Sequence, residues 1–270
     1  MKLYFKIPGD FIRKPVILCI LPMILFFILT QIPYGSYGTR IQSSLKSAPF
    51  QPLTVTGSGF VRNKNGKAIL MCQSGSARKK IKIDKSRMRD LKAWKPQIVA
   101  YSRRHYMQNT SVLNPRVIVL HYTAMSGFPW NLVNSKRSAG ETPGLASHYV
   151  IDGEKIWRIL PDNVRSRGCY GINHVAINIE MVALNANHLQ KKKKTMKTCA
   201  YLVKYLMNRY GIPLSKVYSH QDVAYMDRKR TPEVLDYVNG SPYGKVDPGE
   251  KNMRHIKLMI KKMKNFNVYE

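Results

Sequence analysis

The chain has 270 residues, of which 45 are Lys or Arg and 15 are Asp or Glu, so its formal net charge is +30. This length accommodates one large domain or two small ones, with room for a substantial core. Four cysteines in a chain this long exclude a disulfide-stapled scaffold, and the charge indicates a polyanion nearby: nucleic acid, anionic lipid or acidic cell-wall polymer.

Residues 1–38 predict an export signal. Four basic residues in the stretch 1–14 precede fifteen apolar residues, 15–29, and the apolar run continues weakly to Tyr34. The run is short of the roughly 20 residues that span a bilayer, so it fits an uncleaved membrane anchor or a cleavable signal peptide, and we favour the anchor. The basic flank is expected to stay cytoplasmic, which places the rest of the chain outside the membrane and argues against a nucleic-acid partner.

Residues 39–110 are expected to form a tether followed by a small basic extension. The first part mixes Gly, Ser, Pro and Gln without periodicity, as linkers do. Two short runs, 59–63 and 67–72, flank a turn and predict a β-hairpin. The basic run 76–89 is expected to be solvated, with contact to wall or lipid as the alternative, and a helix is predicted over 92–107.

Residues 111–270 predict an α/β domain with a central mixed β-sheet flanked by helices. Short β-type runs alternate with helical patterns, which is how such sheets are built. Cys72, Cys169 and Cys199 lack the spacing of metal ligands, and we expect buried free thiols, one disulfide being the alternative. The predicted strands are 117–123, 148–152, 155–160, 176–182 and 216–220, and the predicted helices are 194–210 and 251–266.

Three metal-capable side chains stand at the ends of probable strands: His121, His220 and Asp247. A catalytic zinc site uses three nitrogen, oxygen or sulfur ligands from the protein and keeps a fourth position open. Taken alone, each histidine is more simply a structural hydrogen-bonding residue. Their joint context favours a zinc site.

Glu180 and Lys245 are the candidates for proton transfer and charge stabilisation. Glu180 lies inside the apolar run 176–182, where burial would raise its pKa toward that of a useful base, a salt bridge to a lysine being the alternative. Lys245 stands two residues before Asp247, so an extended backbone would project both side chains to one side. A fixed positive charge there would stabilise a developing oxyanion.

Five motifs stand in order along the chain, and together they resemble the type 2 N-acetylmuramoyl-L-alanine amidase family, which is similar to amidase-type phage lysozymes and peptidoglycan-recognition proteins. They are IVLHYTA, LASHYVIDGEKIWRILPDN, GINHVAINIEMV, VYSHQDVA and KVDPG, and the resemblance covers roughly residues 115–261. It implies Zn²⁺ held by His121, His220 and Asp247, with Glu180 as general base and Lys245 near the scissile carbonyl. The implied reaction is hydrolysis of the amide bond between N-acetylmuramic acid and L-alanine in peptidoglycan.

Four further residues are weaker candidates. His148 precedes Tyr149 where some relatives carry a tyrosine that faces the active site. It is expected either to orient substrate or water, or to support a site residue through a hydrogen bond. Tyr122 and Trp130 are expected to line a substrate groove, with core packing as the alternative. Arg228 belongs to a basic loop that would favour an anionic glycan or peptide carboxylates.

Two departures from the family pattern bear on the substrate. Many relatives carry a histidine shortly before the GxN segment, where this chain reads SRGCYGIN, so contact with substrate there is in doubt. The segment between His220 and Asp247 is longer than in many relatives and is expected to rim or cover the cleft.

Two alternatives to the amidase remain open. A recognition module of the same fold would bind peptidoglycan without cleaving it, and a zinc hydrolase of the same family would cut another peptidoglycan amide. In every case we expect a cell-membrane protein with its catalytic domain outside, or a secreted one if the signal is cleaved. Anionic wall polymers or lipid headgroups are then the expected use of the charge.

Overall fold

A computed structural model describes residues 69–74, 77–236 and 240–263, which all fall within one compact unit. The predicted export signal, the tether and the run 59–63 lie outside the described residues. Among the helices that are described, none has the length and apolarity to span a bilayer.

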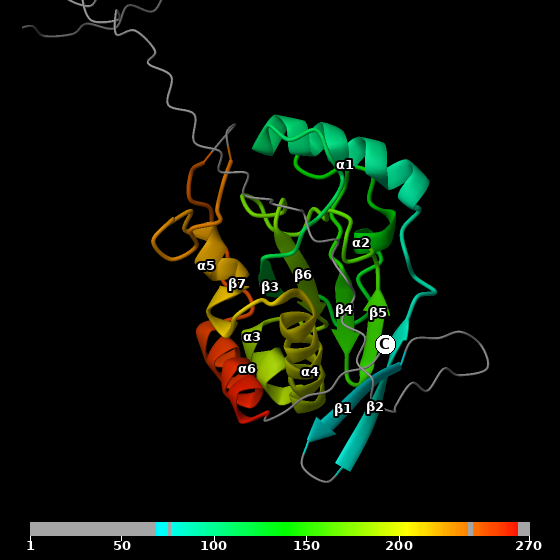
Figure 1. The fold of residues 1–270 in the computed structure, drawn as a ribbon, viewed down its shortest axis with the longest axis vertical. Helices are drawn as coiled ribbons and strands as arrows, with labels where there is room; N and C mark the ends of the chain where they lie inside the picture. Colours follow the sequence, from blue (N-terminus) through cyan, green and yellow to red (C-terminus); the bar gives the residue numbers. More distant parts are fainter. Residues whose placement is uncertain (1–68, 75–76, 237–239, 264–270) are drawn as a thin grey trace, which may run out of the picture. The chain divides into compact units, whose positions relative to one another are not determined.

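The core of the domain is a mixed sheet of seven strands in the order β1-β2-β5-β4-β6-β3-β7 (Figure 1). The parallel pairs are β2 with β5, β4 with β6, and β3 with both β6 and β7, whereas β1 with β2 and β4 with β5 are antiparallel. The strands are β1 Ile69–Ser74, β2 Ala77–Asp84, β3 Val117–Tyr122, β4 Tyr149–Asp152, β5 Lys155–Arg158, β6 Ala176–Met181 and β7 Val217–Ser219. The expected α/β class and the five predicted strands of the domain are therefore confirmed.

Helices α4 and α6 cover one face of the sheet. The 18-residue helix α4 (Lys193–Tyr210) ends at Gly211, whose φ of 64° suits glycine, and α6 spans Glu250–Lys262. Their apolar stripes pack with the short helix α3 (Ala186–Lys191) against the residues of β3 and β6 that point to that face, such as Leu120 and Ile179. Cys199 lies in this core as a buried free thiol, and Cys169 is buried and free elsewhere, as expected.

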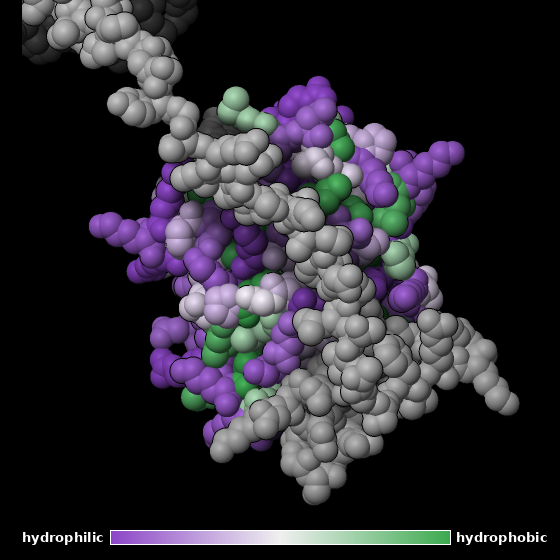
Figure 2. Space-filling model, viewed as in Figure 1, coloured by the Kyte–Doolittle hydropathy of each residue, from purple (hydrophilic) through white to green (hydrophobic). Residues whose placement is uncertain are grey.

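The opposite face carries the shorter elements and the loops. Val117 and Val119 of β3 pack there with Val223 of α5 (His220–Ala224). A one-turn helix α2 (Asn131–Asn134) and a short 3₁₀ turn (Leu214–Lys216) complete the described elements. The described part of the surface in Figure 2 is mostly hydrophilic, with hydrophobic side chains in small patches. Most large apolar side chains of the described residues are thus buried in the interior.

Helix α1 (Leu91–Tyr106) confirms the helix predicted in the extension and packs onto the domain. Asp90 caps its first turn through Lys92 and Ala93, and Trp94, Ile98 and Tyr101 are buried. These side chains form a core cluster with Ala146, Leu160 and Val164. The expected domain boundary at residue 110 remains a prediction, although α1 shares this cluster with residues beyond that boundary.

Replacing Trp94 with alanine tests how much α1 contributes to the domain. The side chain is buried, and its indole Nε1–H donates to the carbonyl of Arg165 at 2.9 Å. Loss of this packing is expected to lower the free energy of unfolding by about 3–5 kcal/mol, measured by urea denaturation. Lys92→Ala, at an exposed position of the same helix, should change it by less than about 0.5 kcal/mol. Equal effects of both substitutions would mean that α1 does not share the core.

Two local expectations need correction. The basic run 76–89 was not expected to form a strand, but it supplies β2. Ile81 and Ile83 alternate with Lys80 and Lys82 at the period of a strand. This run, and not residues 59–63, is the described partner of β1. The run predicted as a strand to residue 220 pairs only to Ser219. Ser219 instead caps α5 through a reciprocal hydrogen bond with Asp222.

Candidate metal centre

His121, His220 and Asp247 converge although they come from three different elements. His121 lies in β3, His220 is the first residue of α5, and Asp247 precedes α6 in a loop, so the expectation that all three end strands is wrong for the last two. The Nδ1 atoms of the two histidines are 3.0 Å apart, and Asp247 Oδ2 lies 3.2 Å from His121 Nδ1 and 3.1 Å from His220 Nδ1. All three side chains are buried.

This triangle of donor atoms fits a tetrahedral metal ion. Ligand distances of about 2.0–2.1 Å around a tetrahedral zinc ion put neighbouring ligand atoms about 3.3–3.4 Å apart, so an outward shift of a few tenths of an ångström suffices. Two imidazole nitrogens and one carboxylate oxygen are also the donor set of catalytic zinc sites. Burial disfavours the charge on Asp247, but hydrogen bonds from His121 and His220 outweigh it and hold the pKa of the carboxyl below its usual range. The carboxylate is thus ionised, as a ligand must be.

Asn178 fixes the orientation of His121. Its side-chain amide nitrogen donates to Ser166 Oγ at 2.8 Å, so its Oδ1 is the atom that lies 2.9 Å from His121 Nε2 and accepts that N–H. When His121 is protonated, its Nδ1–H donates to Asp247; when the ring is neutral, the proton stays on Nε2 and the lone pair of Nδ1 points into the donor triangle. His220 has no such support, because its Nε2 is buried without a partner among the described residues.

Asn178→Ala is expected to weaken metal binding without removing a ligand. The substitution leaves the His121 Nε2–H without its acceptor and its ring free to turn, a loss that costs about 10–100-fold in metal affinity. Isothermal titration with Zn²⁺ measures the effect. Asn178→Asp keeps an oxygen in place and should restore most of the affinity; if both variants bind as the wild type does, Asn178 does not orient His121.

Glu180 stands beside this triangle on the neighbouring strand. It is paired across β3 and β6 with His121, and its Oε1 accepts a hydrogen bond from Ser147 Oγ at 3.4 Å. Its Oε2 is buried with no hydrogen-bond partner among the described residues. Burial raises the pKa of Glu180, with the charge of Asp247 adding to that shift and the charge of His121 opposing it. A carboxylate with a free buried oxygen and a raised pKa is suited to accept a proton.

An open groove of about 950 Å³ runs over the triangle. Tyr122, Glu180 and Lys245 line it, together with the rest of the segment 241–247. The end of the long segment between His220 and Asp247 therefore rims the cleft. The groove does not include Trp130, which is 53% exposed and packs on Phe128 with ring centroids 4.9 Å apart. Arg228 is exposed and likewise does not line the groove.

His148 is not brought to the groove, so its expected catalytic role has no support in the geometry. The ring is completely buried, Nε2–H donates to the carbonyl of Val164 at 2.9 Å, and Nδ1 accepts the N–H of Asn178 at 3.0 Å. Nδ1 therefore links the start of β4 to β6, and Nε2 links it to the loop that contains Val164. Burial lowers the pKa of His148 to about 4, which keeps the ring neutral.

The buried His148 predicts a loss of stability in acid. A histidine has a pKa of about 6.5 when unfolded, so between pH 6.5 and 4 the unfolded chain binds a proton that the folded chain does not. Stability is thus present above pH 6.5 and lost as the pH falls toward 4, by at most about 1.4 kcal/mol per pH unit from this residue. Urea denaturation at pH 7, 6 and 5 should show a shallower pH dependence in His148→Gln. An unchanged slope would assign the acid sensitivity to other groups.

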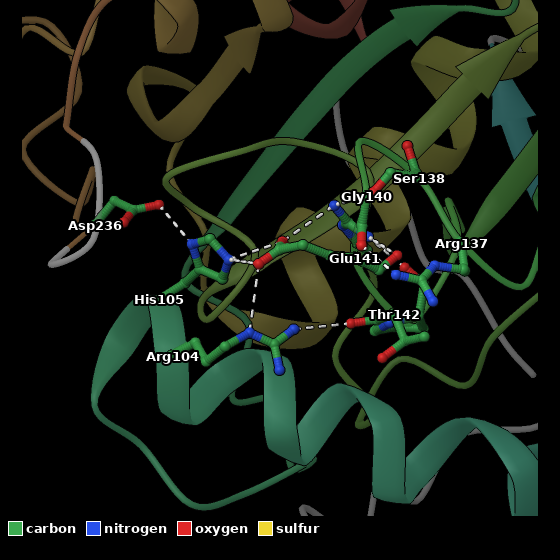
Figure 3. A network of polar contacts seen from close by, with 10 residues as sticks. Arg104, His105, Arg137, Ser138, Gly140, Glu141, Thr142 and Asp236 are labelled. Carbon is green, nitrogen blue, oxygen red and sulfur yellow. Dashed lines mark hydrogen bonds and ion pairs between the residues drawn. The ribbon is translucent and has the colours of Figure 1, made fainter.

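A polar network that the sequence did not reveal holds one wall of the groove. Arg167, which lines the groove, donates to the carbonyls of Ser138 at 2.9 Å, of Glu141 at 3.1 Å and of Pro143. In Figure 3, His105 of α1 lies between Glu141 and Asp236, at 3.0 Å from a carboxylate oxygen of each. Helix α1 thereby joins two loops of the wall. No sign of this network is visible in the sequence, because its members are far apart along the chain.

Comparisons with known proteins agree with the motifs. A family model described as N-acetylmuramoyl-L-alanine amidase matches residues 111–234 and confirms the resemblance. Among solved structures, the chain is similar to a mutant endolysin from Bacillus subtilis, with 17% identity, coverage of 67% of this chain and 99% of that chain, and a TM-score of 0.41. It is also similar to the endolysin N-acetylmuramoyl-L-alanine amidase LysCS from Clostridium intestinale, with 25% identity, coverage of 55% and 85%, and a TM-score of 0.39. A third similar structure is the Staphylococcus aureus hydrolase AmiA, with 18% identity, coverage of 56% of this chain and 73% of that chain, and a TM-score of 0.37. No curated protein gives a significant match.

Proposed function

Because residues 111–234 carry the sequence pattern of the N-acetylmuramoyl-L-alanine amidase family, we propose that the chain is a zinc-dependent amidase that cleaves peptidoglycan between N-acetylmuramic acid and L-alanine. The observation that carries the proposal is the triangle of His121 Nδ1, His220 Nδ1 and Asp247 Oδ2, with edges of 3.0 to 3.2 Å, beside a buried carboxyl in an open groove. Loss of a ligand would have favoured a recognition module instead, and no ligand is lost.

The residues of the site divide the work of amide hydrolysis between them. A zinc ion held by the triangle would supply Lewis-acid chemistry, polarising a carbonyl and lowering the pKa of water. Glu180 takes the proton from the attacking water through its free carboxylate oxygen and passes it to the leaving amine. Lys245, at the groove wall, stabilises the negative charge that develops on the carbonyl oxygen.

The shape of the groove suits a polymer rather than a small metabolite. Its volume of about 950 Å³ leaves room for a sugar with several residues of its peptide. Its wall carries both aromatic and cationic side chains, including Tyr122 and Lys245. These can pack on a glycan and pair with peptide carboxylates. The anchor and the extracytoplasmic position expected from residues 1–38 remain predictions.

Metal reconstitution of the full chain tests the proposal. Protein stripped with a chelator is expected to leave the turbidity of a purified peptidoglycan suspension unchanged, and one equivalent of Zn²⁺ should restore clearing. Mg²⁺ should not restore it, because that ion prefers six oxygen ligands over imidazole nitrogens. Full activity in the stripped protein would show that the cleavage does not depend on zinc.

A further inference from the structure

A second cleft lies at the edge of the sheet, where β2 and β5 meet the first turns of α4. Its volume is about 430 Å³, and it shares no lining residue with the groove at the metal centre. Five cationic side chains line it, against two acidic ones, Asp84 and Glu154. The cationic residues are Lys82, Arg87, Lys155, Lys194 and Lys197.

The positive charges in this cleft are only partly offset by the described part of the chain, since five cationic side chains line it against two carboxylates. None of its four lysines makes an ion pair with another described residue, whereas Lys192 next to them is paired with Asp152 at 2.6 Å. The preceding chain cannot supply partners either, since residues 11–83 contain no Asp or Glu. Like charges gathered around a hollow repel one another, and a bound anion would relieve that repulsion.

The cleft is built on rigid elements. Lys194, Lys197 and Tyr201 lie at helical spacing on one face of α4. Tyr201, Ile156 and Trp157 are buried and form its apolar base. Arg87 is held over three aromatic rings, with its guanidinium carbon 4.0 Å from the centroid of Phe128 and 4.9 Å from that of Trp157. The guanidinium of Arg87 therefore loses little further freedom when a ligand binds, whereas the four lysines are exposed and reach the cleft from fixed backbone positions.

We propose that this cleft binds the phosphate group of a phosphate ester. Several ammonium groups and one guanidinium around a hollow favour a compact anion with several acceptor oxygens, and Arg pairs with phosphate through two parallel hydrogen bonds. A lipid headgroup and a soluble phosphate ester share this chemistry. The inference does not depend on the amidase, because it uses none of the residues of the metal centre.

Binding of glycerol 3-phosphate to the full-length chain, measured by isothermal titration, tests the proposal. Lys155→Gln/Lys197→Gln removes two charges from the cleft, and Lys251→Gln/Lys261→Gln removes two exposed charges from α6 as the matched control. The cleft pair is expected to lower the affinity about ten-fold and the control pair less than about two-fold. Equal thermal unfolding midpoints for the three proteins show that the variants are folded.

Vesicles distinguish the two sources of the phosphate group. If the cleft pair also abolishes sedimentation with phosphatidylglycerol vesicles, and pure phosphatidylcholine vesicles never bind, the ligand is a lipid headgroup. If the titration depends on the cleft while vesicle binding does not, the ligand is a soluble ester. The proposal is overturned if both variant pairs lose affinity equally, since the attraction is then diffuse, or if wild type binds no glycerol 3-phosphate and no phosphatidylglycerol.

Discussion

Glu180→Gln is expected to lower kcat on purified peptidoglycan by about 10²–10⁴-fold, the usual contribution of a positioned general base. Glutamine keeps the shape of the side chain and can still hydrogen-bond to Ser147, but it cannot take a proton from water. Zinc affinity should change little, because Glu180 is not one of the three residues of the donor triangle. Release of new amino groups, followed at saturating peptidoglycan, measures the effect.

Glu233→Gln is the matched control for this prediction. Glu233 lies outside the groove, where it pairs with Lys216 and accepts a hydrogen bond from Tyr218. The substitution removes the same charge and should leave kcat within about two-fold of wild type. A Glu180→Gln enzyme that retains more than a tenth of the wild-type kcat would assign proton transfer to another group.

Asp247→Asn is expected to remove zinc binding and, with it, catalysis. The substitution replaces the charged oxygen of the triangle by an amide, which binds zinc poorly, and leaves His121 and His220 facing each other at 3.0 Å. Losing the hydrogen bond from His121 to Asn178 is expected to cost about 10–100-fold in affinity for Zn²⁺, and losing Asp247 should cost more. Metal content after dialysis, measured by mass spectrometry, gives the outcome.

A change in thermal stability separates metal loss from misfolding in this variant. Wild-type protein should gain stability with added Zn²⁺, by about 2.7 kcal/mol at a hundred-fold excess over Kd, and Asp247→Asn should gain none. Asp227→Asn removes an acid from the same loop, at a side chain paired with Arg230, and should respond to zinc as wild type does. Zinc bound at one equivalent by Asp247→Asn would contradict the assigned ligand set.

Sequence patterns predicted the α/β fold and singled out His121, His220 and Asp247, which the structure brings together, because both left local signals. The runs around His121 and Glu180 are apolar and short, and they form the buried parallel strands β3 and β6. Alternation then places Asn178 on the same face of β6 as Glu180, two residues earlier. That alternation could have identified Asn178, since a buried asparagine on the face that carries Glu180 needs a partner.

Other features required the three-dimensional arrangement. His148 is of a residue type common in active sites, but its ring lies in the core, where Val164 and Asn178 provide hydrogen-bond partners for both nitrogens. The pairing of His105 with Glu141 and Asp236 joins positions separated by 36 and 131 residues, and no local pattern specifies it. The run that forms β2 has alternating isoleucines, but it is so basic that a solvated stretch was expected instead of a strand.

The identity of the bond that is cut tests the central claim most directly. The full-length chain, loaded with zinc, is incubated with purified peptidoglycan, and the released fragments are identified by mass spectrometry beside chelated and Glu180→Ala samples. A zinc amidase should release stem peptides that begin with a free L-alanine amine, and only the zinc-loaded wild type should do so. Binding without any cleavage would contradict this prediction in favour of a recognition module, and new termini at another amide would contradict the assigned substrate bond.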